Sequence, residues 1–236
     1  MFKKAKLPNN IYQNNNYQKA TYTGLSKVLY YLNHKLLDFR VDKINNKHIL
    51  EVGGGARPHI DYMDTSQIKT YTILDDKIFK NEVKKLKKKY KKIKFNFIDH
   101  KKLKQSKIKI KYSRLISSHT FEHFRYFEDD FIKLINMIDS KAIISIAIPC
   151  DPGLVWRFLQ YISFFKQKKY YGWNKLKEKD LDDARDHITP AQNIMKIVNY
   201  YFAGNKKFFF PFLVPLIELN IFLIIQIKVS NFKNSF

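Results

Sequence analysis

Cysteine is almost absent from this sequence: Cys150 is the only one among 236 residues. An intramolecular disulfide is therefore excluded, and the fold has to be stabilised by a hydrophobic core. The composition can supply such a core, because hydrophobic residues make up 45% of the chain and charged residues 28%. The scarcity of cysteine is typical of a reducing compartment, and we expect a cytoplasmic location.

Long uninterrupted apolar runs are also missing. The N-terminal stretch MFKKAKLPNNIYQNNN has no apolar segment after its basic residues, so we do not expect a secretory signal. The most apolar region, FFFPFLVPLIELNIFLIIQIKV, is interrupted by Pro211, Pro215, Glu218 and Asn220. Such residues are unfavourable near the centre of a bilayer. We therefore predict no transmembrane segment and interpret the region as two strands, the second at about 220–229.

Arginine and acidic residues are scarce relative to lysine. The formal net charge is +23, yet only six of the 44 basic residues are arginine. Proteins that read phosphates or bases tend to use the planar arginine fork. The abundance of lysine together with asparagine, isoleucine and phenylalanine is what an AT-rich genome produces without selection for binding. The charge therefore leaves a nucleic-acid partner open but does not favour it.

Glycine occurs only seven times, and three of these positions are consecutive, in HILEVGGGARP at 48–58. A glycine run directly after an apolar stretch predicts a turn at which the backbone approaches a ligand closely. A nicotinamide fingerprint needs a third glycine where this sequence has Pro58. A Walker loop needs a Gly-Lys-Ser/Thr ending, which the run does not have.

The pattern that remains is Glu51-x-Gly53-x-Gly55, an acidic residue followed by a tight turn. Asp75 ends the next apolar run about twenty residues later, where a bound ribose would need a carboxylate acceptor. The two features together indicate a nucleoside-containing ligand.

Apolar runs and helical patterns alternate along the chain. Runs that predict strands occur at 48–52, 70–74, 94–98, 114–117 and 142–148. Helical spacing occurs at 22–39, 80–94, 131–138 and 190–201, and the second of these helices carries one apolar stripe among lysines. Strands separated by helices predict an α/β fold with a parallel sheet and right-handed crossovers.

We expect two regions: an N-terminal arm and helical segment at 1–45, and a binding domain at 46–236. After Pro149 the alternation breaks into DPGLVWRFLQYISFFKQKKYYGW, which is too long for a simple connection. We interpret about 151–185 as an insertion or lid. Its aromatic residues fit core or lid packing better than a substrate box: Trp156, Phe158, Tyr161, Phe164 and Trp173.

Five segments, in order, resemble the class I S-adenosylmethionine-dependent methyltransferases that act on small molecules. HILEVGGGA is similar to the first motif of that family, YTILDD to the second, FIDHKKL to the adenine-side segment, RLISSHTFEHF to the fourth strand and its exit, and AIISIAIPCDPG to the fifth. DARDHITPAQNI and the strands after FFFP resemble a type 11-like subset whose members often lie among surface-polysaccharide genes. The resemblance implies a Rossmann-like, seven-stranded, mostly parallel sheet with helices on both faces and an antiparallel last strand.

The resemblance also implies S-adenosylmethionine as the cofactor and S-adenosylhomocysteine (SAH) as its product. Glu51 would hold the amino end of the cofactor, and the glycines would make room for its methionine part. Asp75 would accept hydrogen bonds from both ribose hydroxyls, and Asp99 or the His100 backbone would meet adenine. The complete set of expected cofactor residues is Glu51, Gly53, Gly54, Gly55, Asp75, Asp76, Asp99, His100 and Ser118.

Three histidines are candidates for a general base, which helps when the methyl acceptor is a hydroxyl. His119 and His123 follow the fourth strand, and His187 follows the insertion, so all three should face the carboxyl edge of the sheet. Each also has a structural alternative, such as a helix cap or a helix-entry residue. His59 and Asp61 are weaker candidates.

The run His119-Thr-Phe-Glu122-His123 also matches H-x-x-E-H, an inverted zinc-protease signature. That motif needs both histidines on one helix and a further carboxylate ligand. His119 directly follows a predicted strand, so we expect the two rings to diverge, and we expect no metal ligands.

The sequence therefore predicts an enzyme, an S-adenosylmethionine-dependent methyltransferase acting on a small polar acceptor. A sugar or a surface-glycan precursor, for capsule or lipopolysaccharide, is the favoured acceptor. The same fold could instead methylate RNA through its lysine-rich surface. It could also be a non-catalytic or membrane-peripheral module. The acceptor atom and the oligomeric state are not indicated.

Overall fold

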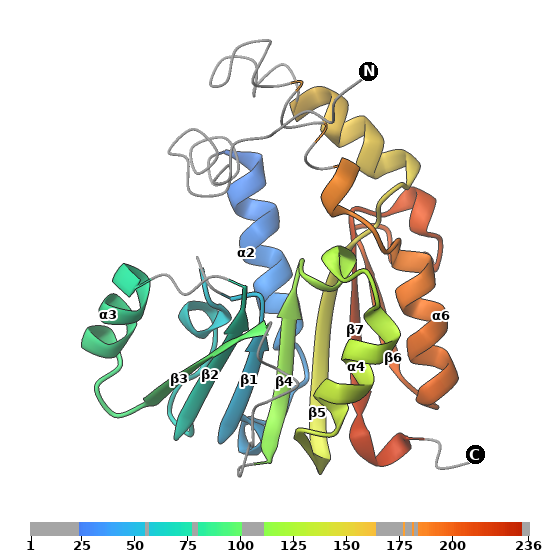
Figure 1. The fold of residues 1–236 in the computed structure, drawn as a ribbon. Helices are drawn as coiled ribbons and strands as arrows, with labels where there is room; N and C mark the ends of the chain where they lie inside the picture. Colours follow the sequence, from blue (N-terminus) through green and yellow to red (C-terminus); the bar gives the residue numbers. More distant parts are fainter. Residues whose placement is uncertain are drawn as a thin grey trace, which may run out of the picture.

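The computed structural model describes residues 24–54, 57–76, 80–100, 111–163, 177, 181 and 184–232. These residues form one seven-stranded sheet with the order β3-β2-β1-β4-β5-β7-β6 (Figure 1). The strands are β1 (His48–Val52), β2 (Thr70–Asp75), β3 (Lys94–Asp99), β4 (Tyr112–Ser118), β5 (Ile138–Pro149), β6 (Lys206–Phe210) and β7 (Phe222–Lys228).

The sheet is parallel from β3 to β5, and β7 runs antiparallel to both of its neighbours, β5 and β6. The expected Rossmann-like sheet with an antiparallel last strand is confirmed. β7 is the last strand in the chain but lies inside the sheet. The strand order reverses between β1 and β4, and ligands of open α/β sheets bind at such a reversal, outside the carboxyl ends of the strands.

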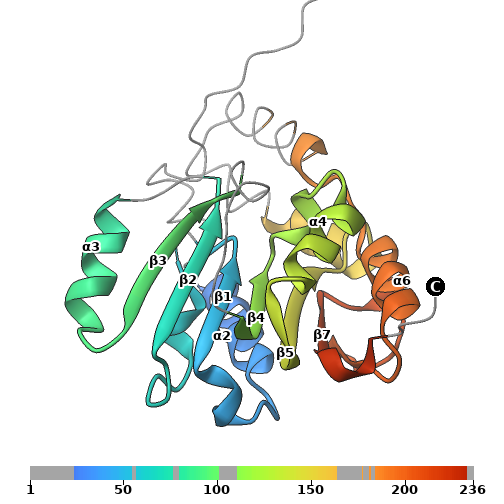
Figure 2. The same cartoon turned by 60° about the horizontal axis from the view of Figure 1, so that its bottom comes forward.

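Helices cover both faces of the sheet (Figures 1 and 2). Their bounds are α2 (Leu25–Leu37), α3 (Lys80–Lys89), α4 (Phe127–Ile135) and α6 (Ala191–Tyr201), and residues 154–163 after β5 are also helical. Among the described residues, no helix combines the length and the apolar character that a membrane crossing requires.

Two hydrophobic cores lie on opposite faces of the sheet. One contains Phe131 of α4 and Ile194 of α6. The other contains Leu37 of α2 and Leu86 of α3. Because both faces are covered, the central strands are buried almost continuously, which is why they read as apolar runs rather than as alternating patterns.

All predicted strands are confirmed, but some boundaries differ. β5 begins at Ile138, inside the predicted helix 131–138, while α4 begins earlier, at Phe127. The first turn of α4 carries three acidic residues, which favour a helix N-terminus. α3 ends at Lys89 rather than at residue 94, because β3 already begins at Lys94. The predicted arm at 1–16 lies outside the described residues.

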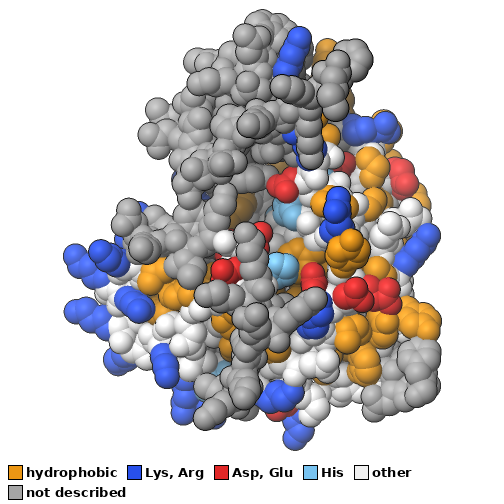
Figure 3. All heavy atoms as spheres, in the orientation of Figure 1, with side chains coloured by type: hydrophobic (Ala, Val, Ile, Leu, Met, Phe, Trp, Pro, Cys, Tyr) orange, Lys and Arg blue, Asp and Glu red, His pale blue; other side chains and the backbone are white. Residues whose placement is uncertain are grey.

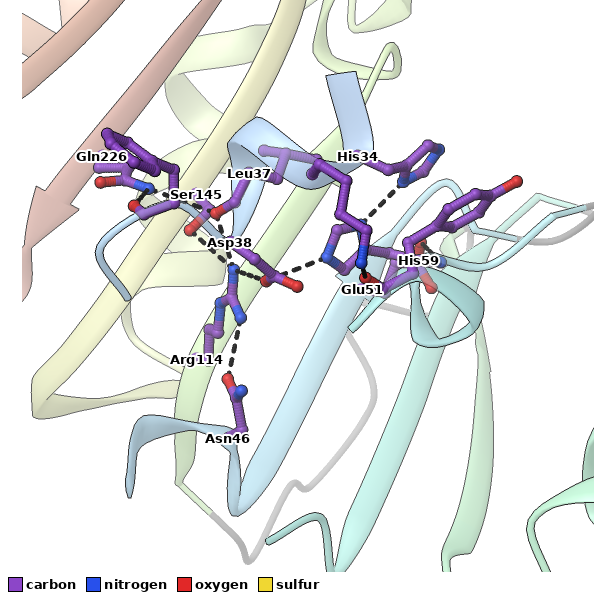
Figure 4. A network of polar contacts seen from close by, with 12 residues as sticks. His34, Leu37, Asp38, Asn46, Glu51, His59, Arg114, Ser145 and Gln226 are labelled. Atoms are coloured by element: carbon purple, nitrogen blue, oxygen red, sulfur yellow. Dashed lines mark hydrogen bonds and ion pairs between the residues drawn. The ribbon is translucent and has the colours of Figure 1, made fainter. Parts of the chain in front are cut away.

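A buried arginine connects α2 to the sheet (Figure 4). Arg114 of β4 is fully buried, and its Nη2 lies 2.7 Å from Oδ1 of Asp38, just after α2. Its guanidinium also donates to the Asn46 side chain (2.9 Å), the Leu37 carbonyl (2.9 Å) and the Ser145 hydroxyl (3.2 Å). The described part of the N-terminal segment is thus packed on the sheet, whereas the expected division at residue 45 stays a prediction.

Asp38 is the counter-ion of this arginine. Burial alone would raise the pKa of the Asp38 carboxyl, but a hydrogen bond from His59 and the charge of Arg114 hold that pKa below its ordinary value. The carboxylate form therefore stabilises the fold above the pKa of the unfolded chain, and this contribution is lost as the pH falls through the lower pKa of the folded state.

Removing this counter-ion should be costly. Asp38→Ala should lower the free energy of unfolding by about 3–5 kcal/mol, because the buried Arg114 charge loses its partner. Lys89→Ala, which removes an exposed ion pair with Asp61 (2.7 Å), should cost about 0–1 kcal/mol. Urea unfolding followed by circular dichroism measures both values. Similar losses in the two variants would contradict a special role for the buried pair.

Candidate functional site

The predicted site residues meet at one edge of the sheet. Gly53 follows β1, Asp75 ends β2, Asp99 ends β3, and Ser118 ends β4. These strands are parallel neighbours, so their carboxyl ends lie side by side at the top of the sheet in Figure 1. The edge contains the reversal between β1 and β4, where a ligand is expected in this class of fold.

The glycine turn after β1 is in close contact with the side chains of Thr120 and Glu51. Gly53 has a φ of +85°, and its N–H donates to the Leu74 carbonyl (2.8 Å). A Cβ at Gly53 would lie 1.9 Å from the Thr120 hydroxyl oxygen, and one at Gly54 would lie 2.2 Å from the carboxyl carbon of Glu51. The sequence suggested that glycine is needed here to make room for a ligand. The structure gives a second reason, because the backbone of the turn lies close to two side chains of the protein. Gly55 lies outside the described residues.

Glu51 lies beneath this turn and is 2% exposed. One carboxyl oxygen accepts a hydrogen bond from the Tyr71 hydroxyl (2.6 Å) and the other from the His59 backbone N–H (2.7 Å). Burial raises the pKa of the Glu51 carboxyl to about 8, although both hydrogen bonds act in the opposite direction. A positively charged group near the turn would favour the ionised form of this carboxyl.

The other expected cofactor residues continue along the edge. Asp75 and Asp99 are register partners on β2 and β3. Asp76 is exposed, with Oδ1 3.4 Å from Nδ1 of His100. The hydroxyl oxygen of Ser118 is buried and makes no hydrogen bond with any described residue. An unsatisfied buried hydroxyl at this edge fits a bound polar molecule, so the residues present suit a nucleoside cofactor.

His119 follows β4 directly, with a left-handed φ of +51°. Its Nε2 contacts the side-chain amide of Asn33 on α2, and its Nδ1 lies 3.8 Å from Oε1 of Glu122. Burial, together with the neighbouring His187 and His123, lowers the pKa of His119 to about 4. The ring is therefore neutral near pH 7 and a weak proton acceptor, which argues against His119 as the general base.

His123 and His187 lie together, with their ring centroids 5.0 Å apart. Nδ1 of His123 is 3.1 Å from the Asp186 carbonyl oxygen. Nδ1 of His187 is 2.8 Å from Oδ2 of Asp151, which follows β5. The structure thus brings together two of the three predicted catalytic residues, one from each side of the predicted insertion.

Backbone hydrogen bonds explain why His187 reaches the fourth-strand exit. The N–H groups of Ile188 and Thr189 both donate to the Glu122 carbonyl (2.9 Å each). The Thr189 hydroxyl donates to the Phe124 carbonyl (2.6 Å). The segment before α6 is therefore fixed to the 3₁₀ turn Phe121–His123.

His119 and His123 turn their rings toward different partners, as expected: Nε2 of His119 contacts Asn33, whereas Nδ1 of His123 faces the Asp186 carbonyl oxygen. Nδ1 of His119 and Nε2 of His123 lie 3.8 and 3.9 Å from the same oxygen, Oε1 of Glu122. Sequence reasoning considered Glu122 only as part of a zinc-protease motif. The structure places this carboxyl between the two rings.

The two weaker candidates have structural roles. His59 is fully buried, its Nδ1 is 2.8 Å from Nδ1 of His34, and its Nε2 is 3.2 Å from Asp38. Asp61 is exposed and pairs with Lys89. Neither belongs to the histidine pair.

On the surface, imidazole and acidic side chains gather in the middle of the face shown in Figure 3, above β4 and β5. Of the aromatic residues of the insertion, Phe158 and Tyr161 are exposed, and Phe164 and Trp173 lie outside the described residues. The lysines of α3 lie at the left margin of this view, over β3 and away from the imidazoles.

Residues missed in the sequence are Asn33, Thr120 and Asp151. Asp151 could have been found, because it follows a strand at the same edge as Asp75 does. Asn33 gave no such signal, since it lies in a helix whose spacing indicated only packing.

Known structures share this fold. No family model and no curated protein matches the chain in sequence. The plantazolicin methyltransferase BpumL, solved in complex with SAH, superposes with a TM-score of 0.60 at 13% identity, over 93% of this chain and 91% of that one. The DszA carbon methyltransferase superposes with a TM-score of 0.59 at 12% identity, over 90% of this chain.

The CurJ carbon methyltransferase gives a TM-score of 0.58 at 13% identity, and this chain covers 57% of its length. This chain also covers 57% of the DszA chain. The likeness to CurJ and DszA therefore concerns only part of each of those proteins. At these identities the likeness establishes architecture. The chain has the class I fold of S-adenosylmethionine-dependent methyltransferases.

Proposed function

We propose that this protein is an S-adenosylmethionine-dependent methyltransferase that acts on a small polar acceptor. The observation that carries the proposal is the meeting of the glycine turn, Asp75 and the unsatisfied Ser118 hydroxyl at the reversal of the sheet. The presence of SAH in the structurally similar BpumL supports the choice of cofactor. The expected cytoplasmic location belongs to the same proposal.

The cofactor would lie along the carboxyl edge. Glu51 holds its amino end from below the glycine turn, and Asp75 accepts hydrogen bonds from the ribose hydroxyls. Asp99 and His100, at the end of β3, border the adenine. Bound in this way, the cofactor supplies an activated methyl group on a positively charged sulfur.

The acceptor side is rich in polar groups. Glu122, His123, Asp151, Asp186 and His187 lie beside the β4 exit. Such a surface suits an acceptor that presents hydroxyl groups, and we favour a sugar or a surface-glycan precursor. His123 or His187 would accept the proton of the hydroxyl, because His119 is too weak a base.

Methylation of RNA receives less support. The lysine-rich helix α3 packs next to β3, whereas the histidine pair lies at β4 and β5, on the other side of the reversal. The lysine-rich helix is most simply a solvated face. RNA retained on the protein at physiological salt would restore this alternative.

The first test concerns Asp75. Titration with SAH in a calorimeter should give saturable binding, and Asp75→Ala should weaken it by about 1–3 kcal/mol, or roughly 5- to 150-fold, through loss of the ribose hydrogen bonds. Asp139→Ala is the matched control, since Asp139 is an exposed acid near the start of β5, at the opposite edge. An unchanged affinity of Asp75→Ala would remove Asp75 from the site, and no binding by the native chain would refute the proposal.

The second test concerns Glu51. Its pKa of about 8 means that the carboxyl is mostly protonated at pH 7 in the free protein. The positive amino group of SAH should lower this pKa, so binding at pH 7 should release protons. Calorimetry in two buffers of different ionisation enthalpy measures the release. Glu51→Gln should abolish it, and equal heats in both buffers for the native chain would show that Glu51 does not face the cofactor.

The acceptor can be identified by methyl incorporation from labelled cofactor. We expect label in nucleotide-sugar or glycan-precursor pools, because the acceptor side is lined with polar groups. Label found only in RNA, or only on a carbon atom as in the carbon methyltransferases of similar fold, would overturn the assignment of the acceptor while leaving the cofactor site in place.

A further inference from the structure

A possible ligand set for a cation is formed by Glu122, His123 and His187. One ligand atom from each residue lies within 4.8 Å of the other two. The residues come from two segments on either side of the insertion, and backbone hydrogen bonds to the Glu122 carbonyl hold these segments together. The relative position of the three residues is therefore fixed by the backbone.

One oxygen of the buried Glu122 carboxyl has no hydrogen-bond partner among the described residues. Its residue is 4% exposed, and Oε2 is buried without a hydrogen bond to any described residue. Oε1 lies 3.9 Å from Nε2 of His123, which is beyond hydrogen-bonding distance. Buried carboxyl groups are usually hydrogen-bonded, paired or bound to a metal, so an unsatisfied carboxyl oxygen beside two imidazoles is a candidate metal ligand.

The outer contacts of the two histidines match those of metal ligands. Nδ1 of His187 is held by the Asp151 carboxylate, and Nδ1 of His123 is held by the Asp186 carbonyl. Metal-ligating histidines usually donate one ring N–H to a carboxylate or a backbone carbonyl and bind the metal through the other nitrogen. Both rings would then coordinate through Nε2.

We propose that Glu122, His123 and His187 bind a divalent transition-metal cation, with Zn²⁺ as the best fit. Two imidazoles and one carboxylate form a ligand set of open zinc sites, which leave a fourth position for water or substrate. Ligand atoms of tetrahedral zinc lie roughly 3.3 Å apart, so the side chains must close by about 1 Å or more on binding. The H-x-x-E-H motif would use both of its histidines, His119 and His123, as ligands. In the structure His119 contacts Asn33 instead, and His187 takes its place in the ligand set.

A role for the metal in catalysis rests on the proposed function. A cation here would bind the acceptor hydroxyl and lower its pKa. The hydroxyl proton would pass to solvent, the oxygen would form the new bond to the methyl carbon, and the electron pair of the broken carbon–sulfur bond would stay on sulfur. Ligated histidines cannot also act as bases, so the metal would take over the role given above to His123 or His187.

Metal binding can be tested without the cofactor or the acceptor. The untagged full chain, freed of metal with a chelator, is titrated with Co²⁺ and followed by visible absorption, and Zn²⁺ then displaces the Co²⁺. We expect one equivalent of Co²⁺ with the strong absorption of a low-coordinate site. His187→Ala and Glu122→Gln should bind at least tenfold more weakly, and Asp151→Asn, which loses an outer contact, about 10- to 100-fold more weakly.

His48→Ala is the matched control, because this histidine lies at the start of β1, at the opposite edge of the sheet, and should leave Co²⁺ binding unchanged. Zn²⁺ should also raise the unfolding temperature of the native chain and of His48→Ala but not that of His187→Ala, which separates loss of the site from loss of the fold. No saturable binding by the native chain, or equal affinity of the native chain and the ligand variants, would overturn the proposal. SAH titration of the metal-free chain tests the proposed function separately.

Discussion

The site depends on the absence of side chains at two consecutive positions. Gly53 and Gly54 let the backbone after β1 lie against Thr120 on one side and Glu51 on the other. A side chain at either position would push the turn away from the fourth-strand exit. Because Thr120 directly precedes the turn that carries Glu122 and His123, the same contact fixes the glycine turn, the proposed cofactor site, relative to the proposed acceptor site.

Arg114, Glu51 and Glu122 are buried ionisable groups, and they differ in how far neighbouring groups satisfy them. Arg114 is paired with Asp38 and donates hydrogen bonds to Asn46 and to the Leu37 carbonyl through its two terminal nitrogens. Glu51 receives two hydrogen bonds but has a raised pKa, which leaves it responsive to a positive ligand. Glu122 has an oxygen without any described hydrogen-bond partner. Of the three, only Glu122 lies past the end of β4, beside the histidine pair.

Much of this arrangement could be predicted from the sequence. Apolar runs separated by helical patterns indicated the parallel sheet, and the glycine turn with Asp75 indicated its ligand edge. Arg114 could not be recognised as buried, because a charged residue in a strand usually faces solvent and its counter-ion lies far away in sequence. The meeting of His123 with His187 was also hidden, since it depends on hydrogen bonds between segments that the insertion separates.

The hydrogen bonds of Ile188 and Thr189 to the fourth-strand exit anchor the far end of the insertion, and its near end is continuous with β5. A segment secured at both ends can change in length and sequence without displacing the groups beside its anchors. If the predicted insertion selects the acceptor, as its place beside the proposed site suggests, its sequence can change while His123 and His187 keep their positions. We expect relatives with this architecture to diverge most between β5 and Ile188.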